Sequence, residues 1–122
     1  ITKAVAAIFK GKQEVLELGN LDAKRDWGHA KDYVYAQWLM LQQDECEDFV
    51  IATGVSMTLE KFVETAFSHL GLDWKDDVIQ DERYFRPREL AVSCSNPNKA
   101  RQKLGWTAST QAGNVVIKML DN

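Results

Sequence analysis

Apolar residues recur at intervals of about three to four positions in five stretches of the chain. This spacing gathers apolar side chains on one face of a helix, so each stretch is predicted to be helical. The predicted helices cover residues 1–10, 32 to the acidic run that begins at 44, 59–70, 97–104 and 114–120.

Residues suited to helix ends flank these stretches. Asp32, Thr58 and Asn96 are favourable N-terminal caps, and Pro97 suits the first helical position. Glycines stand where a left-handed residue commonly ends a helix, at Gly11, Gly71 and Gly105.

Three short apolar segments, at residues 15–18, 49–52 and 78–79, indicate strands. The unbroken run 49–52 is typical of a buried parallel strand, and Pro87 excludes the stretch around it from a central strand. Strands that alternate with helices predict an α/β unit with parallel pairing, containing four to five helices. Three strands are fewer than a free-standing sheet usually has, so we expect an incomplete sheet that leans on another surface.

The composition describes one soluble globular unit spanning residues 1–122. Of these residues, 45% are hydrophobic and 27% are charged, with a net charge of −3 and scattered Lys and Arg. This pattern argues against nucleic-acid binding. No apolar stretch approaches the roughly 20 residues of a membrane helix and no signal peptide is present, so we expect a cytoplasmic location. Both ends fall inside apparent helices and are expected to be cut.

The stretch LGNLDAKRDWGHAKDYV, residues 18–34, resembles the signature of the GDP-mannose 4,6-dehydratases, a branch of the extended short-chain dehydrogenase/reductases. Three later blocks resemble the same family in the same order: FVIATG at 49–54, YFRP at 84–87 with Glu89, and KA at 99–100 with KLGW at 103–106. Four blocks in register cover nearly the whole chain. The resemblance implies the C-terminal, nucleotide-sugar-binding part of a Rossmann-like fold.

Two arginines are placed to bind a diphosphate. Arg25 and Arg86 lie in loops that contain aromatic residues and Gly or Pro, rather than on solvated helix faces. Guanidinium groups fork onto phosphate oxygens, so both are candidate phosphate ligands. Pro87 would stiffen the loop while Glu89 accepts hydrogen bonds from ribose hydroxyls. The resemblance implies the same arrangement, with GDP-mannose or GDP as the ligand.

Three further residues are weaker candidates for substrate binding. The resemblance places Leu18 and Asn20 at a strand end near the base, where apolar and polar contacts could read guanine. Lys3 is a candidate phosphate or base contact, although a solvated helical lysine is the commoner case.

Other readings of the same charges stay open. Arg25, Asp26, Lys31 and Asp32 could instead form a surface ion-pair network. Asp26 and Asp32 with His29 imitate a metal-binding face, but Gly28 interrupts it and a fourth ligand is lacking, so no metal is expected. The two cysteines belong to no ligand pattern, and the four tryptophans are expected to pack.

The resemblance also implies parts of an enzyme that this sequence lacks. The family uses NADP, bound by a Gly-rich turn, and a Tyr-x-x-x-Lys pair. Neither occurs in residues 1–122, so we expect no catalytic or cofactor-binding residues and no turnover by the chain alone. The family pattern is also altered at 91–96 and shortened between 72 and 83.

A second function remains open beside nucleotide-sugar binding. A truncated member of the family could act as a small self-associating scaffold, with its uncovered sheet edge and apolar helix faces paired with a second copy. A homo-oligomer is therefore expected.

Overall fold

The structure is a computed structural model that describes residues 1–121, and these residues form helices and short strands. The helices are α1 (Thr2–Phe9), α2 (Ala30–Leu41), α3 (Leu59–His69), α4 (Trp74–Asp77), α5 (Asn98–Leu104), α6 (Ala112–Leu120) and the 3-10 helix η1 (Glu82–Tyr84). The strands are β1 (Leu16–Leu18), β2 (Lys24–Arg25), β3 (Met57–Thr58) and β4 (Val78–Gln80). Every helix in this part of the chain is too short or too polar to span a bilayer.

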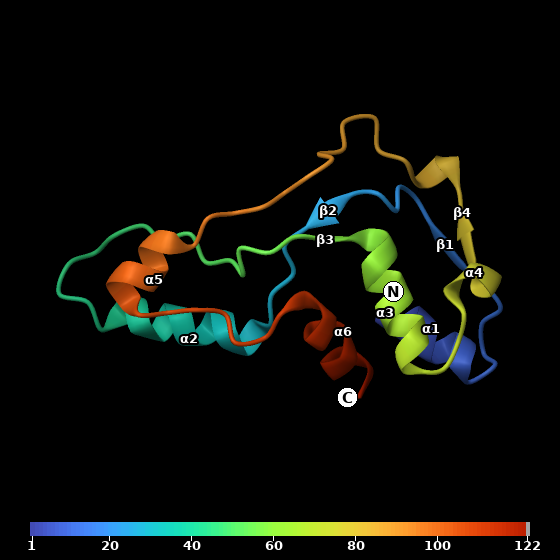
Figure 1. Cartoon of the computed structure of the whole chain (residues 1–122), viewed down its shortest axis with the longest axis horizontal. Coiled ribbons are helices and arrows are strands. Elements are labelled where there is room, and N and C mark those ends of the chain that lie inside the picture. The colour runs from blue at the N-terminus through green and yellow to red at the C-terminus, as the bar shows by residue number, and fades with distance from the viewer. Residues whose placement is uncertain (122) are drawn as a thin grey trace.

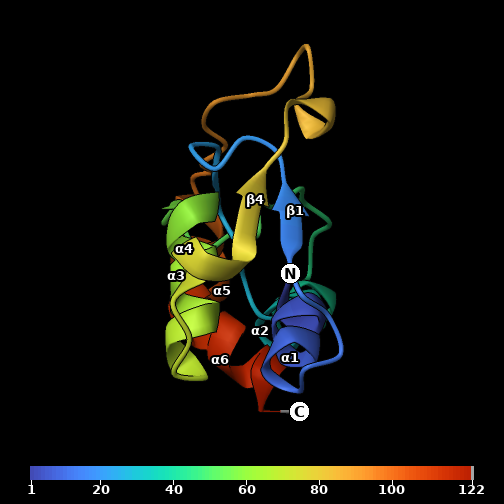
Figure 2. The same cartoon turned by 90° about the vertical axis from the view of Figure 1, so that its right-hand side faces the viewer.

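The strands form two separate pairs. β1 and β4 are parallel, with Leu16 opposite Val78 and Leu18 opposite Gln80, and they lie side by side in Figure 2. β2 and β3 are antiparallel and only two residues long. The predicted strands at 15–18 and 78–79 and their parallel pairing are therefore confirmed, whereas β2 and β3 were not anticipated because so short a run carries no periodicity.

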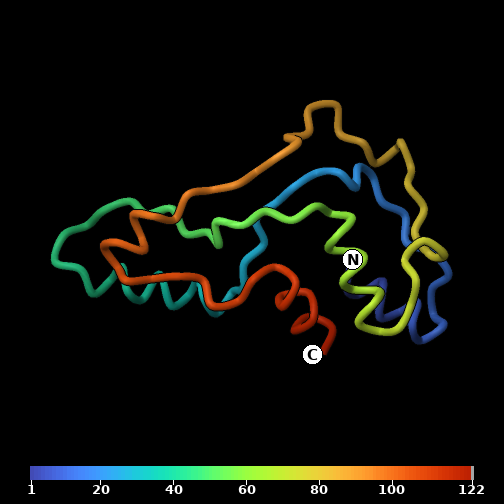
Figure 3. Tube along the Cα trace, in the orientation of Figure 1, coloured from blue at the N-terminus to red at the C-terminus, as the bar shows by residue number. Residues whose placement is uncertain are grey.

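The helices form two groups with separate cores (Figure 1). The main core lies between α1, α3 and α6, and it consists of Val5, Leu16, Phe62, Val63, Ala66, Phe67 and Val116. The second core lies between α2 and α5, and it consists of Ala36, Ala100, Leu104, Trp106 and Ala108. Figure 3 shows the chain passing between the two groups several times, so the molecule is elongated.

The apolar stripe of α3 explains why this helix lies at the centre of the main core. Phe62, Val63, Ala66 and Phe67 recur at helical spacing and are all buried. The Thr58 hydroxyl accepts a hydrogen bond from the Lys61 backbone N–H at 3.1 Å, which confirms Thr58 as the N-terminal cap.

The predicted strand at 49–52 is wrong. These residues are extended but have no strand beside them in residues 1–121, and a strand needs a hydrogen-bonded neighbour. Phe49 and Ile51 pack instead against the second core. The tryptophans also differ from expectation, because Trp106 is buried but Trp38 is 53% exposed.

Three predicted helix starts are displaced, and the simplest case is α6, which begins at Ala112 rather than at residue 114. Helix α2 begins at Ala30, with His29 as its cap residue, so Asp32 lies in the first turn and is not the cap. Its carboxylate accepts hydrogen bonds from the Ser109 hydroxyl at 2.6 Å and from the Thr110 N–H at 2.9 Å. Helix α5 begins at Asn98, one residue later than Pro97. For α2, the Asp32 carboxylate binds Ser109 and Thr110, which are distant in sequence, instead of capping the N-terminus of its own helix.

Asp32 makes the fold sensitive to acid. Burial raises the pKa of its carboxyl, but the hydrogen bonds from Ser109 and Thr110 outweigh this effect and hold the pKa below the usual 3.8. Because the ionised form is favoured in the folded state, its stabilisation is present at neutral pH and is lost as the pH falls below about 4.

We therefore expect Asp32→Asn to lower the free energy of unfolding by about 1 kcal/mol at pH 7. The difference from the unsubstituted chain should be smaller at about pH 3 than at pH 7, because the stabilisation by ionised Asp32 is lost as the pH falls. Urea unfolding followed by circular dichroism at both pH values measures this. Asp44→Asn, at an exposed carboxylate without a hydrogen bond in residues 1–121, is the control. An equal loss at both pH values would contradict the assignment.

Candidate functional site

Two segments of the chain, residues 16–25 and 78–93, run beside each other and carry the candidate site. They are joined at one end by β1 and β4, where the Asp81 N–H donates to the Leu18 carbonyl at 2.8 Å. They meet again at Lys24, whose N–H donates to the Ala91 carbonyl at 2.8 Å. Between these junctions the loop of residues 85–91 rises away from the body of the molecule (Figures 1 and 3). Five predicted site residues belong to these segments: Leu18, Asn20, Arg25, Arg86 and Glu89.

Arg25 and Glu89 contact each other. The Nη2 atom of Arg25 lies 3.4 Å from Glu89 Oε1. The Nη1 group of Arg25 donates hydrogen bonds to the backbone carbonyls of Leu90 at 2.7 Å and Lys24 at 2.8 Å. Both side chains are largely buried, with 30% and 21% exposed. The two residues predicted to bind phosphate and ribose therefore hold the far end of the 85–91 loop.

Arg86 is exposed and lies near the start of this loop, two residues after η1. The last hydrogen bond before it is from the Phe85 N–H to the Glu82 carbonyl, at 3.0 Å. Within residues 1–121, no hydrogen bond or ion pair holds Arg86, Pro87 or Arg88. The guanidinium of Arg86 is thus open to solvent between two fixed ends of the loop.

Leu18 and Asn20 lie at the carboxyl end of β1. Leu18 packs partly against the main core, and the Asn20 Oδ1 accepts a hydrogen bond from the Asp22 N–H at 2.9 Å. Gly19, between them, allows a close approach of the chain at Tyr84. A Cβ on Gly19 would lie 2.5 Å from the Tyr84 carbonyl oxygen, so a larger residue would push η1 away from β1.

Lys3 is set apart from the other candidates. It is exposed on α1, and α1 packs against α3 and α6 rather than along the two paired segments. The structure does not bring Lys3 together with Arg25, Arg86 or Glu89.

Asp26 has a structural role that the sequence analysis did not predict. Its carboxylate accepts hydrogen bonds from the Thr53 N–H at 3.1 Å, the Thr53 hydroxyl at 2.7 Å and the Gly54 N–H at 2.8 Å. This fixes the end of the FVIATG block beside residue 26. The only sequence signal of this contact is the position of Asp26 inside the signature, because its partner Thr53 lies 27 positions away.

The alternative of a surface ion-pair network is wrong. In the described part of the chain, Arg25, Asp26, Lys31 and Asp32 form no ion pair with one another, and the charges of Arg25, Asp26 and Asp32 contact other segments instead. The metal reading finds no support either, since residues 1–121 contain no group of three His, Cys, Asp or Glu side chains able to hold an ion.

Gly28 leaves room for the Tyr33 ring, and burial raises the pKa of the Tyr33 phenol.

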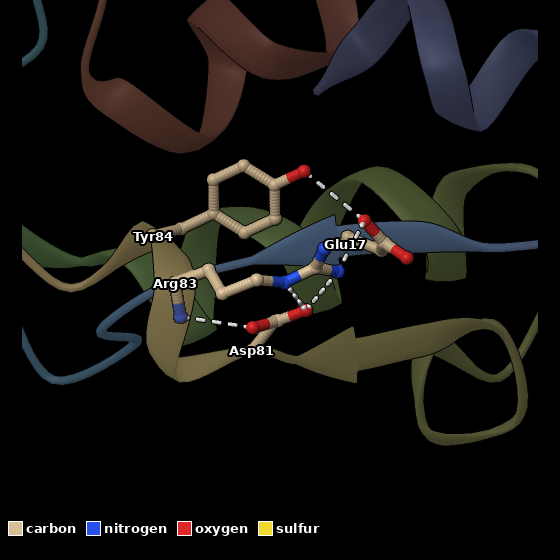
Figure 4. A network of polar contacts seen from close by, with 4 residues as sticks. All are labelled: Glu17, Asp81, Arg83 and Tyr84. Carbon is tan, nitrogen blue, oxygen red and sulfur yellow. Dashed lines mark hydrogen bonds and ion pairs between the residues drawn. The ribbon is translucent and has the colours of Figure 1, made fainter.

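A polar network lies where the 85–91 loop begins (Figure 4). Asp81 bonds to Arg83, which lowers the pKa of the Asp81 carboxyl and raises the pKa of Arg83. The Tyr84 hydroxyl donates to Glu17 Oε2 at 3.1 Å, and this bond to a carboxylate raises the pKa of the phenol. These contacts join η1 to β1.

A model of the family described as GDP-mannose 4,6 dehydratase matches residues 1–119. The chain belongs to this family. It is 47% identical over 121 residues to GDP-mannose 4,6 dehydratase 2 of Arabidopsis thaliana, covering 99% of this chain and 32% of that protein. It is 44% identical over 137 residues to the human GDP-mannose 4,6 dehydratase, covering 98% of this chain and 37% of that protein.

The chain therefore spans 32–40% of the length of the relatives it matches, and it corresponds to their C-terminal part. The alignment with the human relative runs over 137 positions, more than the 122 residues of this chain, so that relative has residues that this chain lacks. The alignment with the Arabidopsis relative runs over only 121 positions.

Solved structures agree on the fold. RMD from Pseudomonas aeruginosa, complexed with NADPH, superposes with a TM-score of 0.87 at 18% identity, over 98% of this chain and 39% of that one. The dTDP-glucose 4,6-dehydratase of Bacillus anthracis, in complex with NAD, gives 0.79 at 20% identity, over 98% and 37%. The Rossmann-like fold class and its incomplete sheet are thereby confirmed.

The close approach at Gly19 yields a test of the site's geometry. We expect Gly19→Ala to lower the free energy of unfolding by about 1 to 3 kcal/mol, because its Cβ would overlap the Tyr84 backbone. Gly113→Ala in α6 is the matched control, since its Cβ would meet only the end of the Met57 side chain of β3, at 4.0 Å. That control should be neutral or stabilising by up to about 1 kcal/mol. Equal effects of the two substitutions in urea unfolding would refute the tight contact.

Proposed function

We propose that this chain forms the nucleotide-binding surface of a GDP-mannose 4,6-dehydratase and binds the GDP part of GDP-mannose. The observation that carries this proposal is the exposed Arg86, held in a loop whose two ends are fixed to the segment that contains Leu18, Asn20 and Arg25. A diphosphate in this loop would meet guanidinium groups from both segments. Family membership and the order of the motifs support the same ligand.

Arg25 retains free donors despite its contacts. A guanidinium has five N–H groups, and the bonds to Lys24, Leu90 and Glu89 use three of them. The Nε–H and one Nη2–H remain for a phosphate oxygen. Glu89 likewise uses only Oε1 on Arg25, which leaves Oε2 as an acceptor for a ribose hydroxyl. Arg25 and Glu89 can thus hold the loop and the ligand together.

The residues present do not fit an NADP site. NADP supplies hydride transfer when bound, and its diphosphate rests on a Gly-rich turn at a helix N-terminus. The spacing G-x-G-x-x-G is absent from residues 1–122, and none of the three tyrosines has a Lys four residues later. We therefore assign binding of the nucleotide sugar to this chain and no step of hydride transfer.

We expect Arg86→Ala to weaken GDP binding by about 1.5 to 3 kcal/mol, the contribution of a charge-assisted hydrogen bond. Arg25→Ala should weaken binding at least as much, because it also releases Glu89 and Leu90. Calorimetric titration with GDP measures both. Guanosine, which lacks phosphate, should bind Arg86→Ala and the unsubstituted chain alike, because Arg86 is proposed to contact phosphate alone. Arg101→Ala, on the exposed face of α5, is the control, and unchanged GDP affinity of Arg86→Ala would sink the proposal.

A second candidate function is self-association, favoured by an exposed apolar face on α2. Val34, Trp38 and Leu41 are 62%, 53% and 81% exposed on this face, and Tyr35 stacks on Trp38 with ring centroids 5.8 Å apart. From Tyr33 to Leu41, α2 contains only one polar residue other than its tyrosines, Gln37. Such a helix is usually covered on more than one side. A second copy would cover it.

We expect a homo-oligomer at micromolar concentration, and Trp38→Glu should shift it to monomer because a charge would be buried at the contact. Size-exclusion chromatography with light scattering measures the mass. Met119→Glu is the matched control, since Met119 is also 53% exposed but lies on α6. A monomeric unsubstituted chain, or equal effects of the two substitutions, would rule out the α2 face as the contact.

A further inference from the structure

Four polar side chains tie the start of the 85–91 loop to β1 (Figure 4). The Asp81 carboxylate accepts hydrogen bonds from the Arg83 N–H and Nε–H, both at 2.8 Å. The Tyr84 hydroxyl donates to Glu17, which lies 67 positions away in the sequence. An Nη2 of Arg83 lies 3.9 Å from the same carboxylate oxygen of Glu17. The network thus joins η1 to β1 through side chains.

The backbone supports this junction. The Asp81 N–H donates to the Leu18 carbonyl, and the Tyr84 N–H donates to the Asp81 carbonyl at 3.1 Å. The Arg83 guanidinium also lies over the Tyr84 ring, 5.9 Å from its centroid. The direction in which the chain leaves Tyr84 is therefore set by several contacts at once.

This network contributes little to the global stability of the fold. The Arg83 side chain is 74% exposed and that of Glu17 is 41% exposed, and ion pairs in such surroundings contribute little to the free energy of unfolding. Their effect is local. Phe85 and Arg86 follow η1 directly, and no contact in residues 1–121 holds Arg86 itself, so its position depends on the two fixed ends of its loop.

We propose that Glu17, Asp81, Arg83 and Tyr84 are positioning residues, which hold the near end of the 85–91 loop and so set the place of Arg86 for a phosphate group. Arg83, paired with two carboxylates, belongs to this support and does not bind the ligand. The ligand in this inference rests on the proposed function, whereas the support of the loop does not.

The first experiment removes one oxygen atom. Tyr84→Phe deletes the hydroxyl that donates a hydrogen bond to Glu17, but it keeps the aromatic ring beneath the Arg83 guanidinium. We expect this substitution to weaken GDP binding about three- to tenfold in calorimetric titration. Glu17→Gln should act similarly, and the double variant should bind no more weakly than Tyr84→Phe. Tyr35→Phe is the matched control, because Tyr35 is 55% exposed and Tyr84 53%, but it lies on α2.

A double-mutant cycle separates positioning from general destabilisation. If Tyr84 acts by placing Arg86, Tyr84→Phe should have no further effect on GDP affinity once Arg86→Ala is present. The thermal midpoints of the single variants should stay within about 2 °C of the unsubstituted chain. Additive losses of affinity in the double variant, or unchanged affinity in Tyr84→Phe, would overturn the proposal.

Hydrogen exchange tests the loop without a ligand. Backbone amides in residues 82–91 should exchange faster in Glu17→Gln and Tyr84→Phe, while those of α3 stay protected. If the unsubstituted chain binds no GDP and the loop still exchanges faster, the proposed function fails but the support of the loop holds. Unchanged exchange in both variants would refute the support itself.

Discussion

Residues 24–32, the central part of the signature at 18–34, hold the two helical groups and the loop of the candidate site in place. Arg25 binds the backbone at Leu90, and Asp26 binds Thr53 and Gly54. Asp32 binds Ser109 and Thr110 through its carboxylate, and its carbonyl accepts a hydrogen bond from the Trp106 indole at 3.0 Å. Each contact joins positions far apart in sequence. Because the main core and the second core share no residues, these polar contacts set the relative position of the segments that cross between them.

The same segment explains why the candidate site is open yet ordered. One end of the 85–91 loop is held by Arg25 and Lys24, and the other end by the network around Tyr84. Two arginines, Arg25 and Arg83, are engaged with carboxylates at these ends. Arg86 lies between them without an internal partner in residues 1–121. Both ends of the loop are therefore anchored by paired arginines, while the guanidinium of Arg86 is left without an ion pair in residues 1–121.

Sequence patterns predicted the elements whose causes are local. The stripe of α3 and its Thr58 cap involve residues within one or two turns, and both are observed. Patterns that depend on distant partners failed: residues 49–52 are apolar enough for a strand but have no neighbour, and Asp32 binds Thr110 instead of capping α2. The family motifs predicted Arg25 and Glu89 as candidate site residues, but no spacing could reveal that they contact each other across 64 positions.

The unpaired run at 49–52 and the exposed face of α2 have one physical cause. A strand with no polar alternation is stable when both of its faces are covered, and α2 is apolar around most of its circumference. Both need more partner surface than residues 1–121 supply, and the solved structures of the same fold extend well beyond the 37–39% that this chain matches. Self-association and contact with the remaining part of the family fold would therefore use the same surface. A partner that covers Trp38 and Val34 removes the apolar area that drives a second copy to bind, so the two states exclude each other.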